Sequence, residues 1–316
     1  GYHPLARVDE MPWMPKKRYV IMKSYLPQKG RLALDMMLLT ASLQASFDYS
    51  SEEDMAEKFR LSQGLDPLLI ALYAHSPFRQ GRYSGFHSFR GRVWEEVDPH
   101  RCCYIPQGFH EDFSFDQYIE FLLDVPMLFL VRNGKWYEVG GITFREFWEN
   151  GFHGHCATMG DWLLHTTGLF TQVRLRPWIE VRSPDLPPHE LIMSFPALMK
   201  GILYDKKSRQ ECWNRIGSPT FHQAKVLRHE ATLNSLQGQY KDERFQTVAM
   251  DVIEIARAGL ASQNDAESLS YLDPLENMVK KGKSPAAQLL EQCSTSTGEL
   301  LFNCECVRKM ILSKKK

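Results

Sequence analysis

The sequence predicts an α+β fold in which an antiparallel sheet is flanked by helices. Residues 39–49 and 172–182 alternate apolar and polar side chains with the two-residue period of a β-strand. Asn133-Gly134 joins two further strand-like segments, which is typical of a hairpin turn. From Ser208 onward, apolar residues recur with a helical period. Strands joined by hairpins and followed by helices favour α+β over a doubly wound parallel sheet.

The first predicted strand, 39–49, has an unusual polar face. That face carries Thr40, Ser42, Gln44, Ser46 and Asp48. Short hydroxyl and amide side chains, rather than the Lys and Glu of a typical solvated surface, fit the wall of an enclosed polar site. A strand with one solvated side explains the same alternation equally well, so the residues alone leave both interpretations open.

Capping residues and turn residues mark the elements between the two strands. One helix is predicted after a Ser51–Asp54 capping box and another after a Thr143–Glu146 capping box. Two more helices are predicted over residues 67–74 and 115–123. The predicted hairpin pairs residues 127–132 with 135–139.

The second predicted strand, 172–182, gathers charge on one face. Arg174, Arg176, Glu180 and Arg182 share that face, where residues two apart lie roughly 6 to 7 Å from one another. Neighbouring cations at this spacing suit anionic groups such as phosphates. Pro177 cannot donate a ladder hydrogen bond, so it implies an edge position, a bulge or a break. An edge strand with solubilising charge is the alternative.

Composition bounds the function. The 316 residues include 38 basic and 38 acidic ones, so no global field recruits nucleic acid or an acidic membrane. No apolar run approaches the roughly 18 to 20 residues of a membrane-spanning helix. We expect one domain, because no linker divides the chain. Seven cysteines, an odd number, favour a reducing compartment.

The well-known sequence motifs for nucleotide, zinc and hydrolase sites are absent or incomplete in this sequence. The sequence has no GxxxxGK[ST] and no GxGxxG, so an ATP site here cannot be of the Walker or Rossmann kind. His153, His155 and Cys156 lie close together, but no second ligand pair supports a zinc site, and Cys304 and Cys306 do no better. No nucleophile elbow supports a hydrolase.

The segment 74–94 has the character of a binding loop. It mixes Arg79, Arg82 and Arg90 with Phe86 and Trp94. Arginine beside aromatic rings binds carboxylates bidentately while the rings exclude water, which suits amino-acid recognition. A surface loop with ordinary packing aromatics is the alternative.

Several stretches together resemble the glutamate–cysteine ligases of the plant and proteobacterial type. They occur in the order of that family and are LDMM (34–37), QASFD (44–48), SPF (76–78), GFHSFR (85–90), LDVPM (123–127), VRLRPWIEVRSPD (173–185), GILYD (201–205), ARAGL (256–260) and SPAAQLLE (284–291). Each motif alone is weak. The resemblance covers about residues 1–292, which we interpret as one catalytic domain that lacks the family's N-terminal part, with 293–316 as a divergent tail.

The resemblance implies a funnel-shaped antiparallel sheet related to the glutamine synthetase fold, with ATP and Mg²⁺ at one end and glutamate beside them. Magnesium and arginine would neutralise the phosphates while the glutamate γ-carboxylate attacks the terminal phosphorus. Cysteine's amine would then displace phosphate from the γ-glutamyl phosphate. A cytoplasmic location, or a plastid in a plant-like source, and a monomer or weak homodimer are expected.

Roles for individual residues follow from the resemblance only. Arg90 and Arg182 match catalytic arginines, the first at the glutamate α-carboxylate and the second at phosphate. The implied substrate contacts are Arg90, Trp94, Ser46 and Met37; the implied nucleotide contacts are Arg182, Arg174 and Gln44; the implied metal ligands are Glu180 and Gln44.

Departures from the family pattern leave other functions open. Ser46 and His75 replace asparagines, and Val139 replaces a cysteine that forms a regulatory disulfide in plant enzymes. The family also begins with roughly a hundred residues, including most of the magnesium carboxylates, that this chain does not show. The alternatives are therefore a non-catalytic binding module and a γ-glutamyl ligase with another amine acceptor.

Overall fold

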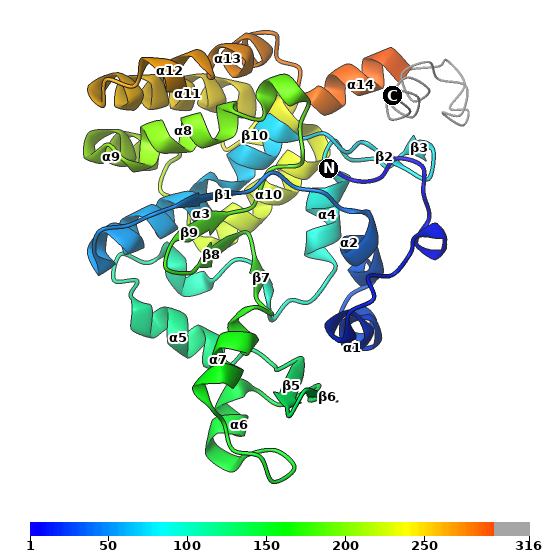
Figure 1. Ribbon diagram of the computed structural model, residues 1–316. Helices are drawn as coiled ribbons and strands as arrows, with labels where there is room; N and C mark the ends of the chain where they lie inside the picture. The colour runs from blue at the N-terminus through cyan, green and yellow to red at the C-terminus, as the bar shows by residue number, and fades with distance from the viewer. Residues whose placement is uncertain (294–316) are drawn as a thin grey trace.

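The computed structural model describes residues 1–293 and is mostly helical, with short strands between the helices (Figure 1). The α-helices are α1 (Lys17–Tyr25), α2 (Ala33–Leu39), α3 (Glu52–Tyr73), α4 (Phe89–Glu95), α5 (Phe115–Leu123), α6 (Phe144–Asn150), α7 (Met159–Thr166), α8 (Ser194–Leu203), α9 (Lys206–Arg215), α10 (Phe221–Asn234), α11 (Phe245–Ser262), α12 (Ala266–Ser270), α13 (Asp273–Lys280) and α14 (Pro285–Cys293). Short 3-10 helices occupy Val8–Glu10, Leu26–Gln28, Pro106–Phe109, His189–Leu191 and Ser235–Gln237.

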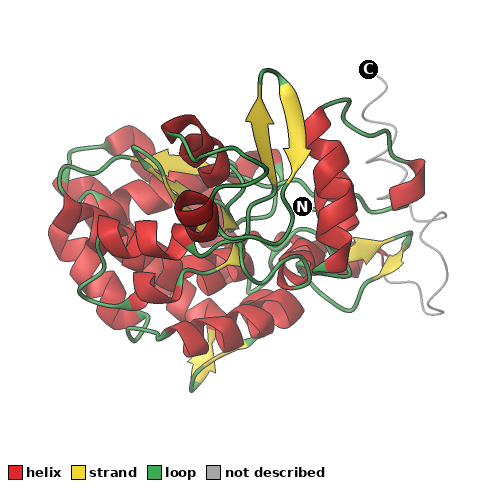
Figure 2. Ribbon diagram, turned by 90° about the horizontal axis from the view of Figure 1, so that it is seen from below, coloured by secondary structure: helices red, strands yellow, loops and turns green. Residues whose placement is uncertain are grey.

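The strands are short and fall into separate groups (Figure 2). They are β1 (Ala45–Phe47), β2 (Phe78–Arg79), β3 (Arg82–Tyr83), β4 (Cys102–Cys103), β5 (Phe129–Arg132), β6 (Lys135–Glu138), β7 (Phe170–Thr171), β8 (Val173–Leu175), β9 (Ile179–Val181), β10 (Gln239–Tyr240) and β11 (Glu243–Arg244). The largest sheet has the antiparallel order β1-β9-β8, and β4 and β7 form a parallel pair. The α+β class is confirmed, although helices dominate.

The central sheet corrects the prediction of one strand over 172–182. β8 and β9 are two antiparallel strands, with Arg174 opposite Glu180. They turn at Pro177, where the Arg176 amide donates to the Trp178 carbonyl at 2.7 Å. The break that proline allowed is therefore what occurs, because a residue without an amide hydrogen fits a turn better than a ladder.

Of the strand predicted over 39–49, the structure contains only the short strand β1. Leu39 is the last residue of α2, and Thr40 and Ser42 form only isolated bridges, with Tyr2 and Asp185 respectively. The segment is extended, but its pairing partner changes along its length, which prevents one continuous ladder.

The long helix α3 corrects the prediction of two helices. Ser51 caps it as expected, accepting a hydrogen bond from the Asp54 amide at 3.1 Å. The helix then continues through Pro67 instead of restarting there. Every residue from Leu61 to Tyr73 is buried, so packing offsets the hydrogen bond that proline cannot make.

The core lies on both sides of α3. The apolar face of the sheet, including Phe47, Ile179 and Val181, packs in one cluster with buried residues of α3, and α10 contacts the same helix. In Figure 1, α8, α9 and α11–α13 stack above this layer, while α5–α7 and the β5–β6 hairpin project below it. The outer face of β1-β9-β8 is left for polar side chains.

Other predicted elements are confirmed. α5 has the predicted bounds, the hairpin turns at Asn133 and Gly134 with positive φ at both, and the Thr143–Glu146 capping box starts α6. The helical C-terminal part is also confirmed to residue 293; Cys304, Cys306 and the tail beyond lie outside the described residues. Over residues 1–293, no helix is long and apolar enough to cross a membrane.

Candidate active site on the central sheet

The polar face of the central sheet brings together residues from two distant segments. Arg174 and Glu180 are cross-strand partners, and their side chains form an ion pair at 2.6 Å between Nη2 and Oε2. Ser46 lies opposite Glu180 on the neighbouring strand, and the Glu180 carboxylate also accepts from the Trp178 indole at 3.2 Å. Gln44, just before β1, donates to the Ser42 hydroxyl at 2.8 Å.

Arg182 is the cation of this face with an unmet hydrogen-bonding requirement. It follows β9, and its amide donates to the Gln172 carbonyl at 2.9 Å. Its Nη1 atom is buried and has no hydrogen-bond partner among the described residues. Burial, and then the charge of Arg174, lower the pKa of the Arg182 guanidinium to about 10. A nearby anion would both accept a hydrogen bond from Nη1 and stabilise the charged form of the guanidinium.

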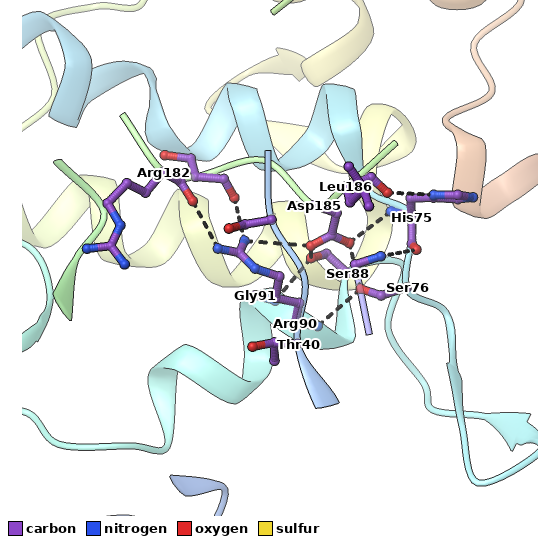
Figure 3. Close-up of polar contacts among 12 residues, drawn as sticks. Thr40, His75, Ser76, Ser88, Arg90, Gly91, Arg182, Asp185 and Leu186 are labelled. Atoms are coloured by element: carbon purple, nitrogen blue, oxygen red, sulfur yellow. Dashed lines mark hydrogen bonds and ion pairs between the residues drawn. The ribbon is translucent and has the colours of Figure 1, made fainter. Parts of the chain in front are cut away.

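Arg90 is buried behind this face and holds the backbone that follows β9 (Figure 3). Its Nη1 donates to the Ser183 carbonyl at 2.8 Å and its Nη2 to the Arg182 carbonyl at 2.9 Å. The Arg182 side chain points away from Arg90 in this view, although its carbonyl is held. Arg90 therefore fixes where Arg182 emerges from the sheet.

A buried carboxylate completes this arrangement. Asp185 lies 3.8 Å from Arg90 Nη1 and accepts from the Ser76 and Ser88 hydroxyls at 2.6 and 3.1 Å. The His75 amide donates to the same carboxylate at 2.9 Å. Burial lowers the pKa of Arg90 to about 10, and the Asp185 charge opposes that shift.

The predicted site residues are thus only partly brought together. Gln44, Ser46, Arg174, Glu180 and Arg182 lie on or beside the central sheet. Two others lie on separate helices. Trp94 is one turn beyond Arg90 on α4, with its ring 6.4 Å from that of Phe170, and Met37 is half-buried on α2. The role of Arg90 at a substrate carboxylate stays a prediction, since its guanidinium here contacts main-chain carbonyls.

Sequence reasoning missed the residues that anchor Arg90. Ser76 and Ser88 lie in the predicted binding loop 74–94 and Asp185 in a family-like motif, but the sequence predicted no individual role for any of them. The available signal was their type: small hydroxyls and an aspartate in motifs that are otherwise apolar or basic predict a buried hydrogen-bonded cluster.

The described residues fit an anion better than a divalent metal. Within residues 1–293, no group of three or more His, Cys, Asp or Glu side chains could hold a metal ion. Of the five predicted site residues on or beside the sheet, Glu180 alone carries a carboxylate, and Arg174 already neutralises it. Magnesium prefers several oxygen ligands, so Glu180 and Gln44 do not form a complete site. Arg182 and Arg174, in contrast, suit phosphate oxygens.

Comparisons with known proteins agree on one family. The family model described as Glutamate-cysteine ligase family 2 (GCS2) matches residues 1–306. The chain is 38% identical to a chloroplastic glutamate–cysteine ligase of Medicago truncatula over 294 residues, which is 92% of this chain and 58% of that protein. It is 37% identical to the chloroplastic enzyme of Brassica juncea over 302 residues, 95% and 59% of the two chains. With glutamate–cysteine ligase B of Oryza sativa subsp. japonica the identity is 33% over 298 residues, 93% and 60%. The chain spans about three fifths of the length of these relatives.

Proposed function

Because the chain belongs to glutamate-cysteine ligase family 2, we propose that it takes part in ATP-dependent joining of the glutamate γ-carboxylate to the amine of cysteine, a step of glutathione synthesis. The observation that carries the proposal is Arg182: a buried guanidinium atom without a hydrogen-bond partner among residues 1–293, next to Arg174 on a polar sheet face. This arrangement gains most from a phosphate, because the described residues leave that atom unsatisfied.

In the proposed reaction, a γ-carboxylate oxygen of glutamate bonds to the terminal phosphorus of ATP, and the bond from that phosphorus to ADP breaks. The amine of cysteine then bonds to the acyl carbon, phosphate leaves, and the amine loses a proton. Arg182 and Arg174 hold phosphate oxygens, so charge is stabilised by groups already in position. Arg90 holds the main chain that carries Arg182, which makes it a positioning residue.

The remaining assignments belong to the same proposal. Trp94, Ser46 and Met37 would contact substrate, and Gln44 would lie beside the nucleotide. Magnesium supplies phosphate neutralisation in such chemistry, but the described carboxylates do not complete its ligand set. The β1-β9-β8 sheet would form part of the funnel of a glutamine synthetase-like fold. We also propose that the protein is located in a plastid, as the relatives' names indicate, or in the cytoplasm. Its proposed oligomeric state is a monomer or a weak homodimer.

Nucleotide binding tests the role of Arg182. We expect Arg182→Gln to weaken ATP binding at least about tenfold by calorimetry, because a charged hydrogen bond is lost. Its thermal stability should be unchanged or higher, since removing a buried uncompensated cation relieves a penalty. Arg7→Gln, which alters an exposed ion pair with Asp9, is the matched control. Equal ATP affinity in Arg182→Gln and the parent chain would count against the site.

The two alternatives predict different outcomes. A non-catalytic module would bind ATP without releasing ADP when glutamate and cysteine are present. A ligase with another acceptor would release ADP with glutamate and an amine other than cysteine.

A further inference from the structure

A cavity of about 600 Å³ is bounded by α4, α5, α10 and the segment 98–107. Its lining includes Trp94, Phe121 and Phe221, but none of Gln44, Ser46, Arg174, Glu180 or Arg182. A volume between roughly 300 and 1,000 Å³ is typical of small-molecule sites. Trp94 is the one lining residue to which the proposed ligase reaction gives a role.

The walls of the cavity are largely apolar. Phe121 and Val125 come from the α5 side, and Phe221 begins α10. The Phe221 ring also packs edge-on against Tyr104, at 6.4 Å between centroids. Such an aromatic wall buries a flat ring with little loss of side-chain freedom where its rings already pack on one another, as Tyr104 and Phe221 do.

The buried guanidinium at the cavity is compensated within the protein. Arg228 is 2% exposed, and its Nη1 donates to the Asp66 carboxylate at 2.6 Å. The Tyr104 hydroxyl donates to the same carboxylate. The Arg228 charge is therefore matched within the protein and does not by itself require an anionic ligand.

The carboxylates that line the cavity are also matched. Glu95 contacts Arg92 at 2.9 Å and Asp98 contacts Arg101 at 2.6 Å. The other two lining carboxylates, Glu120 and Asp124, share Arg145 at 2.8 and 2.7 Å and are mostly exposed. Each lining carboxylate thus already has a guanidinium contact.

Lys225 differs from the other charged residues of the lining. It is exposed on α10, its ammonium lies 5.5 Å from the centre of the Phe221 ring, and it makes no ion pair within residues 1–293. A cation above an aromatic wall and beside an apolar cavity matches a ligand that has a flat apolar body and one negative charge.

We propose that this cavity is a second binding site, for an aromatic monocarboxylate whose ring enters between Trp94, Phe121 and Phe221 and whose carboxylate pairs with Lys225. Apart from Trp94, the site shares no residue with the proposed ligase reaction, and the second-site proposal does not rest on that reaction. It binds its ligand non-covalently, so the expected effects are on affinity alone.

Three probes with one ring system test the proposal by calorimetry at about pH 8, where unperturbed histidines are neutral. They are indole-3-propionate, its neutral amide indole-3-propionamide, and the cationic tryptamine. We expect saturable binding of the carboxylate, at least about threefold tighter than the amide and tighter still than tryptamine. Tryptamine binding as tightly as the carboxylate, or no saturable carboxylate binding, would overturn the proposal.

Variants assign the binding to the cavity. Lys225→Gln should remove the preference for the carboxylate over the amide while leaving amide affinity within about twofold. Lys17→Gln, a lysine on α1 outside the cavity lining, should leave the preference intact. Phe221→Leu should weaken both ligands together. A preference that survives Lys225→Gln would place the ligand elsewhere and refute the assignment.

Arg182→Gln separates this proposal from the ligase proposal. It should weaken ATP but leave indole-3-propionate affinity unchanged, because Arg182 does not line the cavity. Loss of both affinities in this variant would mean that the carboxylate occupies the sheet face, which contradicts the second site. Loss of ATP binding alone supports both proposals, and loss of neither refutes only the first.

Discussion

Replacing Arg90 with methionine should destabilise the protein by about 3–5 kcal/mol, since it breaks a buried charge network. The substitution keeps a long side chain but removes two hydrogen bonds, to the Arg182 and Ser183 carbonyls at 2.9 and 2.8 Å. Hydrogen bonds from a charged donor contribute roughly 1.5–3 kcal/mol each. Asp185 would keep its hydroxyl and amide donors but lose the buried guanidinium charge 3.8 Å away.

Urea unfolding followed by tryptophan fluorescence measures this loss as a lower midpoint at unchanged slope. Arg31→Met is the matched control: Arg31 pairs with Glu96 at 2.9 Å, but its side chain is 80% exposed, so its loss should leave the urea midpoint nearly unchanged. If Arg90→Met costs less than about 1 kcal/mol and instead weakens glutamate binding, the positioning role is wrong and the substrate role predicted from sequence is favoured.

Three further perturbations probe the scaffold in the same unfolding assay. Ser51→Ala removes the N-cap of α3 and should cost about 1 kcal/mol; no change would mean that the cap contributes nothing. Gly201→Ala places a Cβ 2.2 Å from the Ala256 carbonyl and should cost about 2 kcal/mol or more, whereas Gly160→Ala meets no atom closer than 3.7 Å and should be neutral; equal effects would contradict the close helix crossing. His165 is buried, which lowers its pKa from 6.5 to about 4, so the unfolded state binds more protons between those values. Stability should therefore fall by up to roughly 3 kcal/mol as pH drops from about 6.5 to 4, and His165→Gln should flatten that part of the profile.

Local signals in the sequence determined much of the fold. The capping residues Ser51 and Thr143 and the Asn133-Gly134 turn act within a few residues, and the structure confirms all three. The errors arose where tertiary packing outweighs a local rule. Pro67 lies inside a helix because buried neighbours support it, and residues 39–49 change pairing partner because Tyr2 and Asp185 come from distant parts of the chain.

In the candidate site, too, local sequence patterns predicted some features, and contacts between distant segments determined the others. The charged face of Arg174, Glu180 and Arg182 followed from alternation, which strand geometry preserves even across the turn at Pro177. The hydrogen bonds donated by the Arg90 guanidinium could not be predicted, because their acceptors are main-chain carbonyls of a segment about ninety residues away. The pattern of side chains in a sequence does not predict which main-chain carbonyls will accept hydrogen bonds from a buried guanidinium.

The most direct test of the central claim is product analysis. The chain would be incubated with ATP, Mg²⁺, glutamate and cysteine, and γ-glutamylcysteine and ADP would be quantified by mass spectrometry, in the parent chain and in Arg182→Gln. We expect both products in equal amounts only when both amino acids are present, and their loss in the variant. ADP without the dipeptide, or neither product although ATP binds, would contradict the ligase assignment for this chain.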